Sequence, residues 1–330
     1  MNQFDLAVSI HPYIHTPLSK GAIFLNRLLA LAPLALLAIY HYGMMALGTI
    51  LVTAFFVLLP TYISLKLKGR RLADIEHENY YYALLMALAL PAGTSYPAVI
   101  IGALALNLLA FFPREANSVR IINPVALVSC FLAMAFNEKM YFFNGPRPFM
   151  SAAWFNPLPA ESYSGGFLFN IHNEGGAGAG ESVRKIIELL SAWHPCHYGE
   201  LSITLCAAAF IFLVFKSSVD SAPLIGAAAG LGAAVTFNYY GGGAGVIISE
   251  FLSHAFASMF LFYSCFILTD YYSSPMRFSA RVLYGFLYGV LFAFLSASFE
   301  GRDCANYSLA IASTCVPLID NIFNSGGRRE

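Results

Sequence analysis

Five ionisable residues lie inside long apolar runs of the chain or at their ends. Arg27 lies near the start of the first run, Glu250 lies about two turns into another, and Glu200, Asp270 and Asp320 lie at the ends of runs. A charge without compensation at membrane depth costs several kcal/mol. Carboxylates in such places can coordinate an ion, relay a proton or hydrogen-bond a cofactor. The alternative is solvation at the membrane surface, which Arg27 can reach with its long side chain.

Two further segments carry residue types that bind metals or phosphates. Residues 194–200, His-Pro-Cys-His-Tyr-Gly-Glu, include metal-ligand types. A metal site needs three or four ligands in a fixed geometry, Pro195 interrupts any helical face, and no second cluster follows, so we predict no metal site. The glycine-rich run at 175–180 lacks the Gly-Lys-Ser/Thr ending of a P-loop. It either admits a close backbone contact or is a flexible loop.

The apolar runs that position these residues account for most of the chain. Of 330 residues, 58% are hydrophobic and 11% are charged, with a net charge of zero, whereas soluble domains have about 25% charged residues. This composition excludes an ordinary soluble enzyme, a disordered chain and a nucleic-acid binder. Because a span needs about 20 residues, we predict an all-α polytopic membrane protein of about ten spans. The runs are 22–40, 46–65, 80–90, 96–112, 121–136, 201–215, 224–237, 244–269, 282–298 and 307–319.

Positive charges predict how these spans are oriented. With a cytoplasmic N-terminus, 13 of the 18 Lys and Arg residues fall on the inner side, as the positive-inside rule requires. We therefore expect both termini in the cytoplasm and the long loop outside.

The predicted spans divide the chain into three parts. They are a membrane repeat at 1–136, an extracytoplasmic loop at 137–200 and a second membrane repeat at 201–330. Cys196 and Cys304 both fall outside, and whether they pair is left open.

Two runs depart from plain spanning helices. The third has about eleven apolar residues before Pro91, too few to cross the hydrocarbon. The eighth is over-long and begins at three glycines, 241–243. Helices broken by Gly and Pro in both halves of a five-plus-five chain indicate inverted repeats with irregular backbone lining a buried site. The alternative is that Pro91 merely ends a tilted helix.

Six segments in order along the chain resemble the D-type membrane component of Rnf-type electron transport complexes, a family that includes the B-type component of the sodium-translocating NADH:quinone oxidoreductase. Each segment matches a short family motif, and together they span nearly the whole sequence. The segments are Ser9-Ile10-His11-Pro12 with Thr16-Pro17-Leu18-Ser19, Leu88-Ala89-Leu90-Pro91, Ile122-Asn123-Pro124-Val125-Ala126, Gly199-Glu200-Leu201-Ser202, Leu268-Thr269-Asp270 with Ser273-Ser274-Pro275, and Val316-Pro317-Leu318-Ile319-Asp320.

The resemblance implies a fold and a cofactor chemistry. Family members have ten spans in two inverted five-helix repeats, lie in the bacterial inner membrane and carry FMN joined through a phosphoester to a Thr of a D-x-x-S-G-A-T motif. Here the matching segment is 174–180, Glu-Gly-Gly-Ala-Gly-Ala-Gly, and Gly180 occupies the acceptor position. Glycine has no hydroxyl, so we predict that covalent FMN is absent.

A flavin held without a covalent bond, riboflavin or FMN, remains compatible with the sequence. The resemblance places such a cofactor near the membrane, and Asn123 and Asp270, both at helix breaks, are the residues we expect to bind it. Their competing role is helix capping, because Asn and Asp favour N-caps and Pro124 suits a first helical position. The two roles are compatible.

Two functions follow, and the sequence leaves both open. The first is a non-autonomous membrane subunit of an Rnf-like ion-translocating oxidoreductase, which couples electron transfer between ferredoxin or NADH and flavins to Na+ or H+ movement. Its partners would be other membrane and peripheral subunits, with Glu250 and Glu200 on the ion path. The second is a stand-alone transporter or channel of the same architecture, because fold does not fix function.

Overall fold

The computed structural model describes residues 19–67, 69, 75–111, 122–136, 142–156, 162–164, 196–241, 244–256, 259–298 and 304–325. The described part of the first half contains five helices, one over each of the first five predicted runs. They are α1 (Lys20–Tyr42), α2 (Met44–Leu67), α3 (His77–Ala89), α4 (Tyr96–Phe111) and α5 (Pro124–Ala135).

A small sheet follows the first half. Strand β1 (Phe142–Asn144) pairs antiparallel with β2 (Ser162–Ser164), with Phe143 opposite Tyr163. The short helix α7 (Ala152–Phe155) lies between the two strands in sequence. These elements belong to the segment that we predicted as the long loop, and every other described element of the chain is a helix, as the all-α prediction requires.

The second half is also helical, with two of its runs divided. Its elements are α10 (Ile203–Phe215), α11 (Ala222–Asn238), α12 (Ala244–Phe256), α13 (Phe260–Phe262), the π-helix η3 (Tyr263–Ile267), α14 (Phe278–Ser298), α15 (Ala305–Thr314) and α16 (Val316–Ser325). The eighth run, which the sequence marked as over-long and interrupted at glycines 241–243, bends by 65° between α12 and α13. At this bend Met259 adopts a positive φ of 57°.

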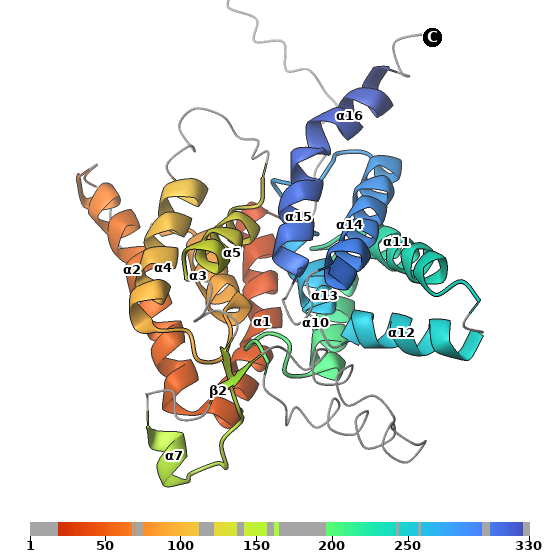
Figure 1. The fold of residues 1–330 in the computed structure, drawn as a ribbon. Helices are drawn as coiled ribbons and strands as arrows, with labels where there is room; N and C mark the ends of the chain where they lie inside the picture. Colours follow the sequence, from red (N-terminus) through yellow and green to blue (C-terminus); the bar gives the residue numbers. More distant parts are fainter. Residues whose placement is uncertain are drawn as a thin grey trace, which may run out of the picture.

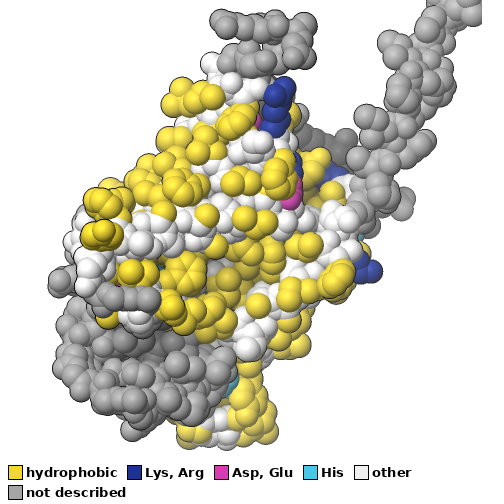
Figure 2. Space-filling view, turned by 90° about the vertical axis from the view of Figure 1, so that its right-hand side faces the viewer, with side chains coloured by type: hydrophobic (Ala, Val, Ile, Leu, Met, Phe, Trp, Pro, Cys, Tyr) yellow, Lys and Arg dark blue, Asp and Glu magenta, His cyan; other side chains and the backbone are white. Residues whose placement is uncertain are grey.

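The helices have the length and surface of membrane elements. By length and composition, α1, α2 and α14 can each cross a membrane, and the bent pair that includes α12 and η3 can form a fourth span. Four shorter apolar helices cover residues within α4, α5, α10 and α11. Figure 2 shows a face of the second half on which hydrophobic side chains predominate and few charges lie. Such a surface fits lipid, and the protein is a membrane protein.

The two halves form neighbouring groups of helices with matching contacts (Figure 1). In the first half α1 contacts α3, α2 contacts α4, and α4 contacts α5. In the second half α10 contacts α13 and η3, α11 contacts α14, and α14 contacts α15. The halves meet where α1 packs on α10 and α5 packs on α15.

The contact between α11 and α14 is made by glycines. A Cβ atom on Gly226 would lie 2.1 Å from the carbonyl oxygen of Val282, and one on Gly285 would lie 2.0 Å from that of Pro223. Gly230 and Gly289 continue the same contact one turn further along each helix. Two small residues four positions apart allow helix backbones to approach closely in a membrane.

The first helix break lies at Pro91, as the sequence predicted. The backbone leaves α3 there, and its polar groups bond to residues just before α10 instead of to a helix. Gly199 N donates to Leu88 O at 2.8 Å, and Tyr198 N donates to Leu90 O at 3.3 Å. Ala92 N donates to Cys196 O at 3.3 Å. Because this non-helical segment is tied to residues 196–199 at the end of the predicted loop, Pro91 does more than end a tilted helix.

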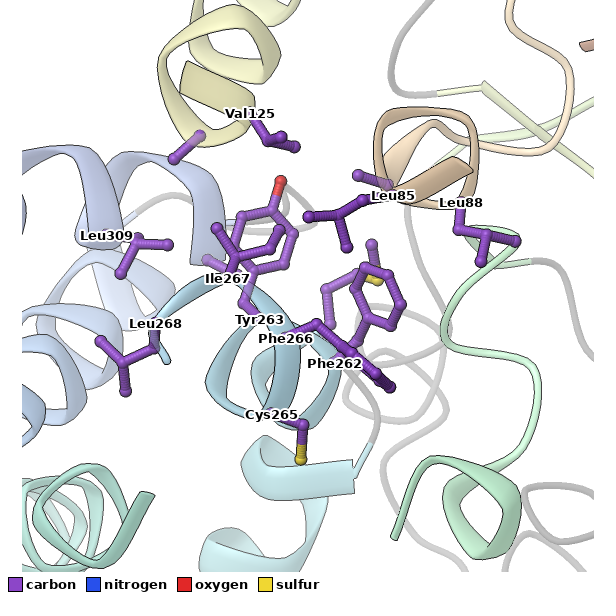
Figure 3. Close-up of a cluster of buried hydrophobic side chains, with 14 of the residues drawn as sticks. Leu85, Leu88, Val125, Phe262, Tyr263, Cys265, Phe266, Ile267, Leu268 and Leu309 are labelled. Carbon is purple, nitrogen blue, oxygen red and sulfur yellow. The ribbon is translucent and has the colours of Figure 1, made fainter. Parts of the chain in front are cut away.

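The second break is held by the apolar core. Figure 3 shows Tyr263 and Phe266 of η3 in one apolar cluster with Val125 of α5 and Leu85 of α3. Both aromatic side chains are 2% exposed or less. A π-helical turn inside a run of apolar residues often marks a functional site, and η3 leads directly to Asp270.

Candidate functional site

A cleft of about 860 Å³ opens at the carboxyl end of η3. Its walls come from both halves of the chain: from α1, from the ends of α10 and α16, and from the segments before α11 and α14. Its lining residues are Ile23, Arg27, Val214, Ser217, Ser218, Val219, Asp220, Ser221, Pro223, Thr269, Asp270, Tyr271, Tyr272, Ser274, Met276, Arg281, Val316, Pro317 and Asp320. A cleft of this volume is within the range of small-molecule and cofactor sites, about 300–1,000 Å³.

A buried ion pair forms one wall of the cleft. The Nη1 atom of Arg27 lies 3.8 Å from Oδ1 of Asp270, and the two side chains are 2% and 1% exposed. Arg27 also donates through Nη2 to Thr269 O at 2.6 Å and to Ser218 O at 3.4 Å. The position of Arg27 near the start of α1 would allow its side chain to extend to the membrane surface. The side chain instead turns into the protein and binds these partners. The alternative of solvation at the surface is not followed, because the Asp270 carboxylate and the carbonyls of Thr269 and Ser218 supply partners inside the protein.

Asp270 is fixed by two hydroxyl groups besides Arg27. Tyr82 donates its hydroxyl to Oδ1 at 2.6 Å, and Ser273 donates to Oδ2 at 3.2 Å. Hydrogen bonds to an ionised acceptor are shorter and stronger than neutral ones. Together these contacts hold the carboxylate in one orientation beside the cleft.

Asn123 lies behind Asp270 and outside the cleft lining. Its Nδ2 donates to Ile267 O at 3.2 Å and to the Ser273 hydroxyl at 3.4 Å. Its Oδ1 accepts from Val125 N at 2.9 Å, and Asn123 is thereby the N-cap of α5, with Pro124 at the first helical position. The structure brings Asn123 and Asp270 together through Ser273. It places Asn123 where it can position Asp270.

Arg27 has unused hydrogen-bonding capacity in this wall. Its Nε and Nη1 atoms are buried and have no hydrogen-bond acceptor within the described part of the chain. The ring of Tyr81 lies under the guanidinium, 5.7 Å from Cζ. Unsatisfied buried donors are rare in proteins and require an explanation, such as a bound group or a water molecule.

A second charge pair lies at the outer rim of the cleft. Arg281 contacts Asp220 at 2.6 Å, and both side chains are about one-third exposed. Asp320 accepts a bond from Met276 N at 3.3 Å. The cleft thus has a charged rim, a buried charged wall and apolar side chains between them.

Glu200 lies at a second, much smaller cavity. This space of about 10 Å³ is lined by Gly199, Glu200, Ser202, Ile203, Cys206, Ala255, Phe256, Met259, Leu261 and Phe262. The Glu200 side chain is 8% exposed, so solvation at the membrane surface is not its role. The N-cap of α10 is Ser202, which accepts from Leu205 N at 3.2 Å.

Glu250 lies on α12 away from both spaces. Its Oε2 lies 4.0 Å from His254 Nε2, and its side chain is 21% exposed. His254 in turn lies 3.1 Å from the Ser296 hydroxyl of α14. The structure therefore does not bring the two carboxylates expected on the ion path to one site.

The other residues singled out in the sequence are Gly180, the possible metal ligands and two cysteines. Gly180 and the glycine-rich run lie outside the described residues. Within the described ranges, no group of three His, Cys, Asp or Glu is arranged to hold a metal ion. Cys196 and Cys304 are both buried free thiols. Burial, together with the nearby charge of Glu200, raises the pKa of the Cys196 thiol well above its ordinary value.

Comparison with known proteins gives the same assignment as the motifs. The family model described as the NQR2, RnfD, RnfE family matches residues 7–326. The chain belongs to this family. One curated relative is the D-type subunit of the proton-translocating ferredoxin:NAD(+) oxidoreductase complex of Clostridium ljungdahlii, which is 22% identical over 95% of this chain and 93% of that protein. Another is the D-type subunit of the Na(+)-translocating ferredoxin:NAD(+) oxidoreductase complex of Acetobacterium woodii, at 21% identity over 97% of this chain and 94% of that protein.

Several residues of the site in this family member were not assigned to it from the sequence. Arg27 was noted as an isolated charge, but nothing in the sequence pairs it with Asp270. Tyr82 and Ser273 were not singled out. A signal existed for Tyr82, because three consecutive tyrosines open the third apolar run, and buried Tyr hydroxyls need partners.

Proposed function

We propose that this protein is a membrane subunit of an Rnf-type complex that couples electron transfer between ferredoxin and NAD+ to the translocation of Na+ or H+. The observation that carries the proposal is the family match over residues 7–326, together with two curated relatives that are both D-type subunits of such complexes. The chain would act with other membrane and peripheral subunits. It supplies a membrane frame and a binding site, whereas its partners supply the oxidation of the donor.

The membrane frame of this proposal has about ten spans in two inverted repeats, at 1–136 and 201–330, separated by an extracytoplasmic loop at 137–200. Support comes from the matching helix contacts of the two halves, in which the second helix packs on the fourth and the fourth on the fifth. The pairs α1–α10 and α5–α15 join equivalent helices, as expected of two related units. Both termini would lie in the cytoplasm and the chain in the bacterial inner membrane, by the distribution of Lys and Arg.

The cleft beside Asp270 is the proposed site for a non-covalent flavin, riboflavin or FMN. Its volume fits a tricyclic ring system, and Tyr271 and Tyr272 in its lining offer aromatic surface. The buried donors of Arg27 that lack acceptors are the observation that favours a bound group with acceptor atoms. Asn123 contributes by positioning Asp270 through Ser273.

A bound flavin supplies one- and two-electron chemistry that no side chain provides. The chain's own contribution is electrostatic. Arg27 and Asp270 give the cleft wall a positive and a negative group in a buried, poorly screened setting. Tyr82 keeps the carboxylate oriented through its 2.6 Å hydrogen bond. Such fixed charges hold a polar ring in one orientation and tune its electron affinity.

Covalent flavinylation is not part of the proposal, because Gly180 offers no hydroxyl for a phosphoester. Glu250 is a proposed residue of the ion path. Its carboxylate lies beside His254 on the broken eighth run, and the His254 ring contacts Ser296. Ionisable groups within membrane segments commonly belong to ion or proton paths.

The experiment that tests the function uses inverted membrane vesicles from cells with and without the gene. Vesicles with the complex should couple ferredoxin-dependent reduction of NAD+ to uptake of Na+ or H+, and deletion of this chain should abolish the uptake. The uptake should return when the chain is restored. Full ion uptake without the chain would contradict the proposal, as would solute transport by the chain alone in liposomes, the result expected of a stand-alone transporter.

A further inference from the structure

Exposed aromatic side chains gather around α7, which lies at the end of the molecule where α1 and α2 meet (Figure 1). The ring of Tyr40, in the last turn of α1, stacks on Phe149 with 4.9 Å between the ring centroids. Trp154 lies 5.5 Å from Phe149 and 4.9 Å from Phe155. Tyr40, Phe149 and Phe155 are each about half exposed, and Met150 is 63% exposed. Exposed apolar patches mark sites of interaction with a protein or a membrane.

The segment that carries this aromatic cluster presents no charge. Residues 148–155, Pro-Phe-Met-Ser-Ala-Ala-Trp-Phe, include no ionisable side chain. The preceding residue, Arg147, is 5% exposed and donates through Nη1 to the carbonyl oxygens of Ala153, at 2.7 Å, and of Asn156. Its charge therefore caps the carboxyl end of α7 from inside. The outer surface of the segment is left apolar, which fits an apolar medium better than water.

Hydrogen bonds and close packing fix the aromatic cluster to the ends of α1 and α2. Trp154 Nε1 donates to Tyr40 O at 3.0 Å, and Arg147 N donates to His41 O at 2.7 Å. Gly43, at the turn between the two helices, has a φ of 61°. A Cβ atom on Gly43 would lie 2.2 Å from the carbonyl oxygen of Trp154. The position of α7 is therefore set by contacts with this turn.

The turn at Gly43 marks a surface of the membrane. Helix α1 has 23 residues and α2 has 24, and each can cross a membrane by length and composition. Each helix is about 35 Å long at 1.5 Å per residue, close to the roughly 30 Å of hydrocarbon. Because only Gly43 separates the two helices, their turn cannot extend far into water. Side chains packed on it lie at the level of the headgroups, where Trp and Tyr are enriched.

The aromatic cluster also continues an apolar face of α1. Exposed apolar residues recur along this helix with the spacing of one helical face, at Leu25, Leu29, Leu36 and Tyr40. Such a face on a helix that crosses the membrane fits lipid. Since Tyr40 ends this face and stacks on Phe149, the same medium reaches the cluster. This continuity favours lipid over a protein partner.

We propose that Phe149, Met150 and Phe155, together with Tyr40, form an anchor that inserts between lipid headgroups at the membrane surface. Large apolar and aromatic side chains of surface-bound segments are buried at the boundary of headgroups and acyl chains in this way. The proposed topology places the anchor in the outer leaflet, whereas insertion itself does not depend on that topology.

The anchor also connects the membrane surface to the first helix break. Asn144 of β1 lies five residues before Phe149, and its N–H donates to Ala92 O at 2.7 Å, directly after Pro91. The segment from β1 to α7 is thus bonded to the first helix break at one end and to the turn at Gly43 at the other. Insertion of its aromatic side chains fixes the depth of that break in the membrane.

Spin labelling of the purified complex in vesicles of phosphatidylethanolamine and phosphatidylglycerol tests the anchor. Phe149→Cys and Phe155→Cys each receive a nitroxide, and power saturation measures its collisions with oxygen, which concentrates in lipid, and with a water-soluble nickel chelate. The matched control is Ser279→Cys, at an exposed position between Arg277 and Arg281. The unaltered complex, labelled in the same way, supplies the background from its own cysteines. Variants that elute with the unaltered complex on size exclusion are assembled, and two positions are used so that one remains if the other variant fails to assemble.

The two collision rates distinguish lipid, water and protein around the aromatic cluster. We expect nitroxides at positions 149 and 155 to collide several times more often with oxygen than with the nickel chelate, and the nitroxide at position 279 to show the reverse. An excess of nickel collisions at position 149 or 155 would overturn the anchor, because the cluster would then face water. Low collision rates with both reagents at these positions would also overturn it, because another subunit would then cover the cluster.

Discussion

Arg27 of α1 and Asp270, which follows η3, form a buried ion pair across the two halves of the chain, with 3.8 Å between Nη1 and Oδ1. Arg27 also holds the end of η3 through the carbonyl of Thr269. The pair therefore fixes the second helix break against the first half and forms a wall of the cleft at the same time. The position of the second helix break and the shape of the cleft wall therefore depend on the same two side chains.

Removing one member of this pair should destabilise the protein more than removing both charges. Arg27→Gln or Asp270→Asn alone leaves a buried charge without its counter-ion, which costs about 3–5 kcal/mol. The double variant leaves two neutral amides, and the amide oxygen at position 270 can accept the bond from Tyr82. In thermal unfolding in detergent, each single variant should have a lower midpoint temperature than the unaltered protein. The midpoint of the double variant should lie well above those of both single variants. Additive losses in the double variant would show that the two residues do not interact.

The glycine contact between α11 and α14 should tolerate no side chain. Gly226→Ala and Gly285→Ala each place a Cβ within about 2 Å of a backbone carbonyl oxygen, so the helices must separate. We expect a loss of about 1–3 kcal/mol or more in unfolding free energy, as in overpacked cores. Gly232→Ala on the same helix is the control, because its Cβ would meet only the Phe251 ring at 3.7 Å. Equal stability of all three variants would refute the close approach.

The mass of the chain should be that of the unmodified polypeptide. Gly180 has no hydroxyl, so a phosphoester to FMN cannot form there. Intact-mass spectrometry of the subunit, separated from the purified complex under denaturing conditions, measures this directly. A chain heavier by one FMN-phosphoryl group would contradict the prediction and direct attention to Ser164 or Ser182, the nearby hydroxyls.

The Cys196 thiol should be unreactive in the folded protein and should make stability depend on pH in the alkaline range. Burial raises its pKa well above 9.0, the ordinary value. Because the unfolded thiol ionises first, its contribution to stability is complete below pH 9 and is lost as pH rises further. Iodoacetamide should label Cys196 in denatured protein and spare it in the folded protein. Cys196→Ala should show a weaker decline in unfolding free energy above pH 9, and an identical decline would contradict this assignment.

The helical runs could be predicted because their physical signal is local. Each apolar run between breakers became helix, and Pro91 ended α3 where its missing N–H and fixed φ require an end. The bend at Met259 could not be placed from the sequence, because neither Gly nor Pro marks it. There a non-glycine residue adopts a positive φ, stabilised by the packing of η3 rather than by its own preference.

The site was predicted only in part for a related reason. Asp270 and Asn123 lie at helix ends. Their residue types and these positions suggested that both belong to the flavin site. Their connection through Ser273, and the approach of Arg27 and Tyr82, depend on contacts between distant segments that a single sequence does not contain. Glu200 was expected on the ion path, with solvation at the membrane surface as the alternative, because it borders an apolar run, and the sequence did not show its burial. Its burial arises from the hydrogen bonds of residues 198–199 to the first helix break, which are tertiary contacts.

The most direct test of the account is the flavin content of the purified complex with the cleft open or blocked. Ser274→Trp places a large side chain in the cleft lining, and Ser279→Trp, at an exposed position outside that lining, is the matched control. We expect acid denaturation to release one flavin fewer per complex from Ser274→Trp than from the unaltered complex or from Ser279→Trp. Equal flavin release from all three complexes would contradict a flavin in this cleft.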